Sequence, residues 1–212
     1  MSIPWTEPLG GGTIRKVKQL SLVVADNKVL DFGAGFGRYS DLFSNIVGQD
    51  NTYLVEVDSD SILELREKGY KNIYEPESAV LPYEDDYFDV IFSSNVLEHI
   101  SRPEYFEYLK EIHRVLKPGK RFVVGIPSYP FKRVFDISKA IQTGMYKYYL
   151  LDDPTHINKM NIITFEKHLS KLYDTVCIEP TKVLFEDSIP YIKKNRMRFR
   201  FMADKVMGYC IK

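Results

Sequence analysis

The sequence predicts an α/β fold, a doubly wound and mostly parallel sheet with helices on both faces. Short apolar runs alternate with longer segments of helical periodicity, the pattern of successive βαβ units. A glycine-rich turn joins the first apolar run to such a segment, and 212 residues fit one domain with a full core. The five runs expected to be buried strands are residues 29–32, 53–57, 90–93, 122–126 and 176–179.

Four segments carry apolar residues at helical spacing. One of them has Ser101 and Glu104 at the spacing of a capping box and ends at Pro118 and Gly119. The expected helices are residues 13–24, a helix capped by Ser59 or Asp60, residues 101–117 and a helix capped by Thr164.

Two parts of the chain depart from this alternation within a single domain, residues 1–212. Residues 127–163 are long for a connection between strand and helix and rich in aromatic side chains, so we expect an insertion that forms a lid beside the functional site. Residues 1–25 combine Trp5, the glycines of 10–12 and a helical pattern, which predicts an N-terminal helix or flap.

The composition is that of a soluble globular protein, with 44% hydrophobic and 27% charged residues. The formal net charge is zero, so nucleic acid is an unlikely partner. There is no apolar run of about 18 residues and no signal-peptide pattern, so a cytoplasmic protein is expected. Cys177 and Cys210 are expected to be buried thiols rather than a disulfide, and we expect no metal site.

The glycine-rich turn lies in VLDFGAGFGRYS, residues 29–40. Its glycines allow close approach by a nucleotide-like ligand, although tight packing of strand and helix also selects glycine. The dinucleotide fingerprint G-x-G-x-x-G fails because the sixth position is Arg38. Asp31 is poorly placed beside a pyrophosphate but suits a ligand with an ammonium or sulfonium charge.

The second strand ends in an acid, Asp58. A carboxylate there can accept hydrogen bonds from both hydroxyls of a ribose. Capping of the following helix is the alternative role for this side chain.

Four ordered motifs resemble those of the class I S-adenosylmethionine-dependent methyltransferases, in their small-molecule branch. The resemblance covers roughly residues 25 to 127. The motifs are VLDFGAGFGRYS, VEVDSDSI, ESAVLPYEDDYFDVIFSSNVLEHI and EIHRVLKPGKRFVVGIP.

This resemblance implies a Rossmann-like, seven-stranded sheet whose last strand, near residues 208–211, runs antiparallel. It implies S-adenosylmethionine as cofactor and S-adenosylhomocysteine as product. Glu77 stands where the family more often has Asp, at the position that contacts the adenine amine. The residues implied to hold the cofactor are Asp31, Gly33, Ala34, Gly35, Asp58, Glu77, Ser78 and Asn95.

Methyl transfer from a sulfonium is an in-line displacement, so the protein mainly has to position a small-molecule acceptor and exclude water. A base is optional and depends on whether the acceptor atom is O, N or C, which the sequence does not indicate. His156 is a candidate base or acceptor-binding residue in the insertion, and His99 either faces the acceptor or makes a structural hydrogen bond. His113 and His168 are expected on solvated helix faces.

Residues 193–200 contain five basic side chains, which form either a solvated face or a dock for an anionic acceptor. Two further functions stay open besides small-molecule methylation: cofactor binding without turnover, and methylation of RNA or protein. A nicotinamide oxidoreductase is the least favoured class. Nothing in the sequence indicates the oligomeric state.

Overall fold

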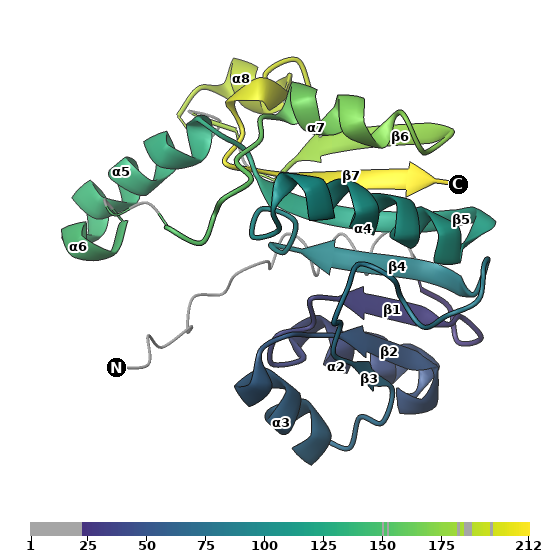
Figure 1. Ribbon diagram of the computed structural model, residues 1–212. Coiled ribbons are helices and arrows are strands. Elements are labelled where there is room, and N and C mark those ends of the chain that lie inside the picture. The colour runs from purple at the N-terminus through teal and green to yellow at the C-terminus, as the bar shows by residue number, and fades with distance from the viewer. Residues whose placement is uncertain (1–22, 150, 152, 182, 185–187, 196) are drawn as a thin grey trace.

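A computed structural model of the chain describes residues 23–149, 151, 153–181, 183–184, 188–195 and 197–212. Within these residues, seven strands form one sheet in the order β3-β2-β1-β4-β5-β7-β6 (Figure 1). The strands are β1 (Val29–Phe32), β2 (Thr52–Val55), β3 (Ile73–Tyr74), β4 (Phe88–Ser94), β5 (Leu116–Pro127), β6 (Thr175–Pro180) and β7 (Lys205–Ile211).

Strand directions confirm the predicted topology. The strands from β3 to β5 pair in parallel, whereas β7 is antiparallel to both β5 and β6. All five apolar runs expected from the sequence are strands, and β7 covers the antiparallel strand that the family resemblance implied. The two-residue strand β3 had no recognisable apolar run.

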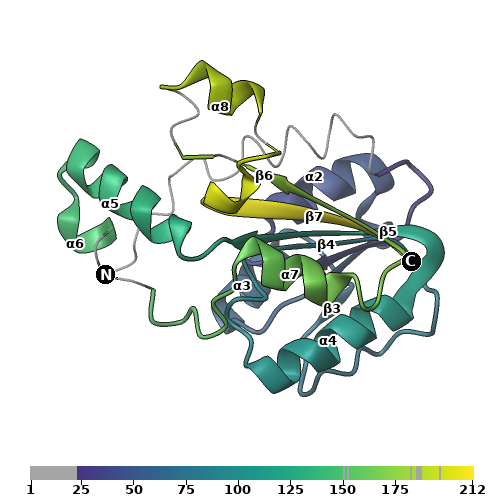
Figure 2. The ribbon, with the colours of Figure 1, turned by 90° about the horizontal axis from the view of Figure 1, so that it is seen from above.

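Helices cover both faces of the sheet. The α-helices are α2 (Arg38–Val47), α3 (Ser59–Glu67), α4 (Arg102–Val115), α5 (Phe131–Thr143), α6 (Tyr146–Tyr149), α7 (Ile162–Leu169) and α8 (Pro190–Lys194). Two short 3-10 helices are η1 (Gln49–Asn51) and η2 (Arg200–Met202). Figure 2 shows α4 and α7 on one side of the sheet and α2 on the other.

The alternation of side chains along the strands supplies a core on each face. Ile91 packs with the residues of α4 and α7, such as Leu109 and Phe165. Its neighbour Phe92 packs on the opposite face with Phe43 of α2. Buried apolar area on both faces is the main source of the stability of such a layered fold.

The segment expected as an insertion holds α5 and α6, which project beyond the carboxyl ends of the parallel strands (Figure 1). Its two ends are tied down, since Ser128 N donates to Asp204 O at 2.8 Å and Tyr129 N donates to Met160 O at 2.9 Å. The segment is therefore anchored beside the sheet.

Three helix starts differ from those expected. Asp58, rather than Ser59 or Asp60, caps α3. Asn161, rather than Thr164, caps α7 by accepting a hydrogen bond from Thr164 N at 2.9 Å. At α4 the side chains of Ser101 and Glu104 bond to each other at 2.6 Å, so the expected backbone bonds of a capping box are not made.

Other expectations are corrected by burial. Cys210 is buried as expected, but Cys177 is exposed, and both are free thiols. Cys210 lies opposite Val176 rather than Cys177 in the register, so the two thiols point to opposite faces. His113 and His168 are half-buried: His113 packs on Tyr173 with ring centroids 5.2 Å apart, and His168 lies 3.3 Å from the hydroxyl of Tyr105.

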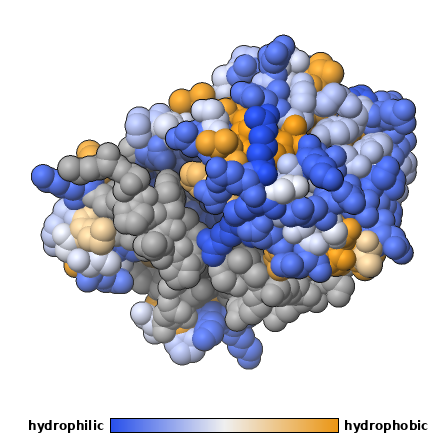
Figure 3. Space-filling view, turned by 90° about the horizontal axis from the view of Figure 1, so that it is seen from below, coloured by the Kyte–Doolittle hydropathy of each residue, from blue (hydrophilic) through white to orange (hydrophobic). Residues whose placement is uncertain are grey.

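Most of the expected N-terminal helix or flap lies outside the described residues. None of the helices in the described ranges has the length and hydropathy needed to cross a bilayer. The face shown in Figure 3 is largely hydrophilic, with small and scattered apolar areas where it is not grey.

Mutation can distinguish whether Asn161 or Thr164 caps the N-terminus of α7. Asn161→Ala removes the side chain that accepts from Thr164 N, so we expect the free energy of unfolding to fall by about 1 kcal/mol. Thr164→Ala is the matched control and should cost less than about 0.5 kcal/mol. Urea denaturation measures both, and a larger loss for Thr164→Ala would contradict the assignment of the cap.

Candidate cofactor site

The glycine loop follows β1 and brings backbone, not side chains, to the edge of the sheet. Gly33 has φ +80°, and a Cβ there would come within 2.1 Å of the Val96 side chain. Gly35 has φ +53°, and a Cβ built on it would meet nothing within 4 Å. The loop is thus tightly packed at Gly33 and open at Gly35, where a ligand can reach the main chain.

The amides of this loop are bonded to the end of β2. Gly33 N and Ala34 N both donate to Val55 O, at 2.8 and 3.1 Å. Gly35 N donates to the Glu56 carboxylate at 2.6 Å. These amides therefore do not form an empty nest for phosphate oxygens.

Glu56 is the functional candidate that the sequence reasoning missed. One carboxylate oxygen accepts from Gly35 N, and the other accepts from Val57 N at 2.8 Å and Asp58 N at 2.9 Å. The side chain is buried, with 8% of the residue exposed. The available signal was its position directly after β2, two residues beyond Leu54, which puts both side chains on the face that bears the glycine loop.

Asp58 is used differently. Its carboxylate accepts from Ser61 N at 2.9 Å and from Ser61 Oγ at 2.7 Å at the start of α3. These hydrogen bonds hold the pKa of Asp58 below its ordinary value. The side chain is exposed and engaged as a helix cap, which was the alternative role considered from the sequence.

Asp31 is buried beneath the loop. Ser40 Oγ donates to its carboxylate at 2.6 Å. Burial, with a smaller contribution from the negative charge of Glu56, raises the pKa of Asp31 from 3.8 to about 7. The Glu56 carboxylate makes this end of the sheet electronegative, and Asp31 adds negative charge only when it is ionised.

The other predicted cofactor residues lie in neighbouring loops. Asn95 follows β4 with φ +60°, and its backbone N–H donates to Gly125 O at 2.9 Å. Glu77 and Ser78 are exposed in the loop after β3, where Ser78 O accepts from the Tyr108 hydroxyl at 3.3 Å. The loops after β1, β2, β3 and β4 all leave the carboxyl edge of the parallel strands, the usual ligand-binding edge of such sheets.

The two histidines proposed for catalysis lie side by side, although 57 positions separate them in the sequence. The rings of His99 and His156 have centroids 4.7 Å apart. His99 Nδ1 is 2.9 Å from Thr155 Oγ1, and His156 Nδ1 is 2.7 Å from the Tyr129 hydroxyl. The structure therefore joins the loop after β4 to the inserted segment.

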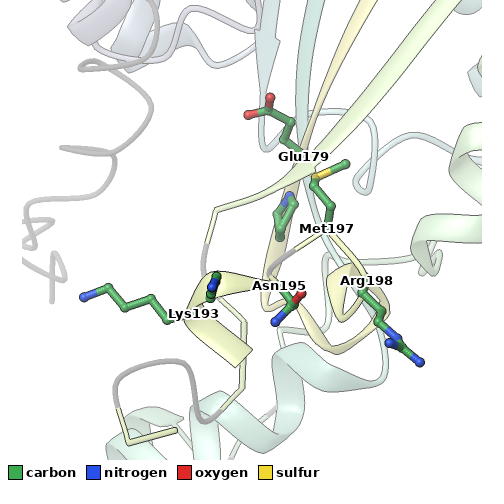
Figure 4. A pocket seen from close by; sticks show the side chains of 7 residues that line it. Glu179, Lys193, Asn195, Met197 and Arg198 are labelled. Atoms are coloured by element: carbon green, nitrogen blue, oxygen red, sulfur yellow. The ribbon is translucent and has the colours of Figure 1, made fainter. Parts of the chain in front are cut away.

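A separate cavity of about 490 Å³ lies beside α8 and β6 (Figure 4). Lys193, Lys194 and Arg198 line it together with the acid Glu179. Three strands, β4, β5 and β7, separate β6 from β1 in the sheet. The basic stretch is therefore remote from the glycine loop.

One family of known proteins matches the part of the chain that contains this site. The profile of a family described as "Methyltransferase domain" matches residues 30–124, which include β1, the glycine loop, Glu56 and most of β5. Residues 30–124 of this chain are thus similar to that methyltransferase domain.

Curated relatives agree with this domain. "Ubiquinone/menaquinone biosynthesis C-methyltransferase UbiE" of Pseudomonas savastanoi is 32% identical over 144 residues, covering 62% of this chain and 55% of the relative. The protein of the same name in Haemophilus ducreyi is 34% identical over 105 residues, or 46% and 40% of the two chains. The chain spans about half the length of the curated relatives it matches.

Solved structures share the fold of the methyltransferase domain. A "SAM dependent methyltransferase" of Archaeoglobus fulgidus has a TM-score of 0.66 at 19% identity, covering 94% of this chain and 93% of its own. A "possible histamine N-methyltransferase" of Thermotoga maritima has a TM-score of 0.63 at 17% identity, covering 95% and 88%. At these identities the likeness concerns the fold alone.

The buried acid beneath the glycine loop makes the stability of the fold depend on pH. Because folding raises the pKa of Asp31 from 3.8 to about 7, the folded state binds more protons between these values. The stability contributed by the protonated group is present at low pH and is lost as the pH rises toward 7. We expect the free energy of unfolding of Asp31→Asn, relative to the unmodified protein, to rise by about 1 to 4 kcal/mol across this window.

Urea denaturation of both proteins at several pH values between about 4 and 8 measures the difference. Asp60→Asn, which removes a carboxylate from the exposed start of α3, is the control. A difference for Asp31→Asn that stays constant with pH would contradict the raised pKa.

Proposed function

We propose that the chain transfers the methyl group of S-adenosylmethionine to a small-molecule acceptor. The observation that carries this proposal is the Glu56 carboxylate bonded to the Gly35 amide, with Asp31 buried nearby. This arrangement favours a ligand that has hydroxyl donors and a positive charge. S-adenosylmethionine has both, in its ribose and in its sulfonium and ammonium groups.

The same carboxylates disfavour a dinucleotide. A pyrophosphate needs free amides at the glycine loop, whereas Gly33, Ala34 and Gly35 donate to protein acceptors. A phosphate next to Glu56 would also bring like charges together in a partly buried place. This supports a methyltransferase rather than a nicotinamide oxidoreductase.

We assign the ribose to Glu56. Three backbone amides use three of the roughly four lone-pair sites of this carboxylate, so Oε2, which accepts from Gly35 N, can accept one further hydrogen bond, from a ribose hydroxyl. Asp58, which the sequence suggested for this role, is occupied at the cap of α3. Glu77 and Ser78 keep their proposed place near the adenine, where the exposed side chains of Val57 and Val80 offer apolar surface.

The acceptor is proposed to bind between the loop after β4 and the inserted segment, which would act as its lid. Asn95, His99 and His156 lie on these two segments. The curated relatives are named as C-methyltransferases of quinone biosynthesis, which supports a small-molecule acceptor. A cytoplasmic location fits such an enzyme and is likewise a proposal.

An anionic group on the acceptor is proposed from Lys193, Lys194 and Arg198 beside α8. Because their cavity is remote from the glycine loop, they would hold a distant part of a long acceptor, not the methylated atom. Glu179 in the same cavity partly offsets their charge.

Calorimetric titration of the purified chain tests the cofactor. We expect S-adenosylmethionine and S-adenosylhomocysteine to bind with dissociation constants in the micromolar range and NAD not to bind. Binding of NAD in preference to either adenosyl compound would contradict the proposal, because the carboxylates at Gly35 should repel its pyrophosphate.

A pair of variants tests which acid holds the ribose. Glu56→Gln should weaken S-adenosylmethionine binding about 10- to 100-fold, because a hydrogen bond to a charged group contributes about 1.5–3 kcal/mol. Asp58→Asn should change the affinity less than about threefold, since Asn is also a good helix cap. The reverse order of effects would return the ribose to Asp58. Thermal unfolding of both variants without ligand controls for loss of structure.

A further inference from the structure

Three side chains capable of binding a metal meet at the acceptor side of the glycine loop. Glu98 and His99 lie in the loop after β4, and His156 lies in the inserted segment. Each offers one ligand atom, and these atoms all lie within 4.8 Å of one another. Carboxylate oxygen and imidazole nitrogen are the ligands of divalent transition metals at such distances.

Glu98 lacks a hydrogen-bonding partner in the described part of the chain. The residue is 2% exposed, and neither carboxylate oxygen makes a hydrogen bond there. The positive charge of Lys205 acts on this carboxyl, but Lys205 Nζ donates to Ser94 Oγ at 2.8 Å. A buried carboxylate without partners is costly and is normally paired or bound to a metal.

Hydrogen-bond contacts at Nδ1 orient both imidazoles. His99 Nδ1 lies 3.2 Å from Thr155 O and 2.9 Å from Thr155 Oγ1. His156 Nδ1 lies 2.7 Å from the Tyr129 hydroxyl. Outer contacts of this kind fix the ring and the tautomer of metal-binding histidines and leave Nε2 as the ligand nitrogen. His156 Nε2 is also 3.5 Å from Asp153 Oδ2, which adds negative charge.

The two segments are joined independently of any ligand. Asn158 N donates to Glu98 O at 2.9 Å, and Asn158 Nδ2 donates to Leu97 O at 3.4 Å. With the His99–Thr155 contact, these bonds hold residues 155–158 against residues 97–99. The three ligand groups are therefore brought together by the fold before a metal binds.

We propose that Glu98, His99 and His156 bind one divalent transition metal ion, such as Zn²⁺, Mn²⁺ or Fe²⁺. Two imidazoles and one carboxylate suit these ions better than Mg²⁺ or Ca²⁺, which prefer oxygen ligands. Three protein ligands leave coordination positions open, as in metal sites that bind water or a substrate.

The position of this site suggests what it does. Val96, between Asn95 and Glu98 in the chain, packs on Gly33 of the glycine loop. The metal would therefore lie close to the cofactor pocket, on the side of the insertion. Resting on the proposed function, the metal binds an oxygen substituent of the acceptor and so orients it toward the methyl group. The acceptor class is then a small molecule with a hydroxyl, carbonyl or carboxylate oxygen.

Metal binding is measured on the full chain without cofactor. The protein is stripped with a chelator, then dialysed against Zn²⁺, Mn²⁺, Co²⁺ or Mg²⁺ alone, and bound metal is determined by elemental analysis. We expect one equivalent of Zn²⁺ or Co²⁺, little Mg²⁺, and visible absorption of the Co²⁺ form. Glu98→Gln and His156→Ala should each weaken Zn²⁺ binding at least about tenfold.

Two controls guard against binding elsewhere and against unfolding. His113→Asn changes a half-buried histidine outside the cluster and should bind metal like the unmodified protein. Circular dichroism and thermal unfolding without metal establish that each variant is folded. Glu98→Gln retains the shape of the side chain, so it tests the ligand even if His156→Ala fails to fold.

The outcomes separate this inference from the proposed function. Less than about 0.1 equivalent of bound metal, or equal binding by Glu98→Gln and the unmodified protein, overturns the metal site. Binding of S-adenosylmethionine to the stripped protein shows that the cofactor proposal stands without it. Metal binding by a protein that binds no adenosyl compound leaves the metal site and overturns the cofactor proposal.

Discussion

The bond between the Glu56 carboxylate and the Gly35 amide is the contact on which the architecture of the site depends. It joins the first loop of the sheet to the end of the second strand, and its length is 2.6 Å. The second carboxylate oxygen takes the amides of Val57 and Asp58, which fixes the chain as it leaves β2 for α3. A single buried side chain thereby satisfies three backbone donors at the edge where a ligand is expected.

The glycine loop packs against the loop after β4, which leads to the acceptor side. Gly33 has no side chain, so Val96 can occupy the space that a Cβ would take. The same short loop then places Glu98 and His99, and Asn158 binds its backbone from the inserted segment. The cofactor edge and the inserted segment are therefore connected through packed and hydrogen-bonded neighbours. We therefore expect a substitution in the glycine loop to shift residues of the proposed acceptor site as well.

The sheet could be predicted from the sequence because apolar runs and periodicity report burial directly. The family resemblance added what these patterns do not specify, namely the direction of β7. Helix caps were less predictable, since Asp58, Ser59 and Asp60 all suit the start of α3 and only the backbone geometry selects Asp58. Glu56 and Asp58 are both acids at the end of β2, and no pattern in the sequence separates a ribose ligand from a helix cap there.

The cluster at Glu98 was beyond prediction for a different reason. His99 and His156 belong to segments whose contact depends on Asn158, Thr155 and the path of the insertion, none of which has a periodic pattern. Burial of Glu98 is equally a property of the assembled loops. Leu97, on one side of Glu98 in the sequence, is buried, whereas His99, on the other side, is exposed. The sequence therefore does not indicate whether Glu98 is buried.

The two ends of the site differ in their charged groups and therefore favour different ligands. At the glycine loop, the carboxylates of Asp31 and Glu56 favour hydroxyl donors and positive charge. Where the loop after β4 meets the insertion, two imidazoles and Glu98, which has no hydrogen-bonding partner among the described residues, form the proposed metal site. In the proposed reaction, the cationic methyl donor would lie against the carboxylates and an oxygen of the acceptor would bind the metal ion, so the opposite charges of the two ends would hold the two reactants in separate, fixed positions.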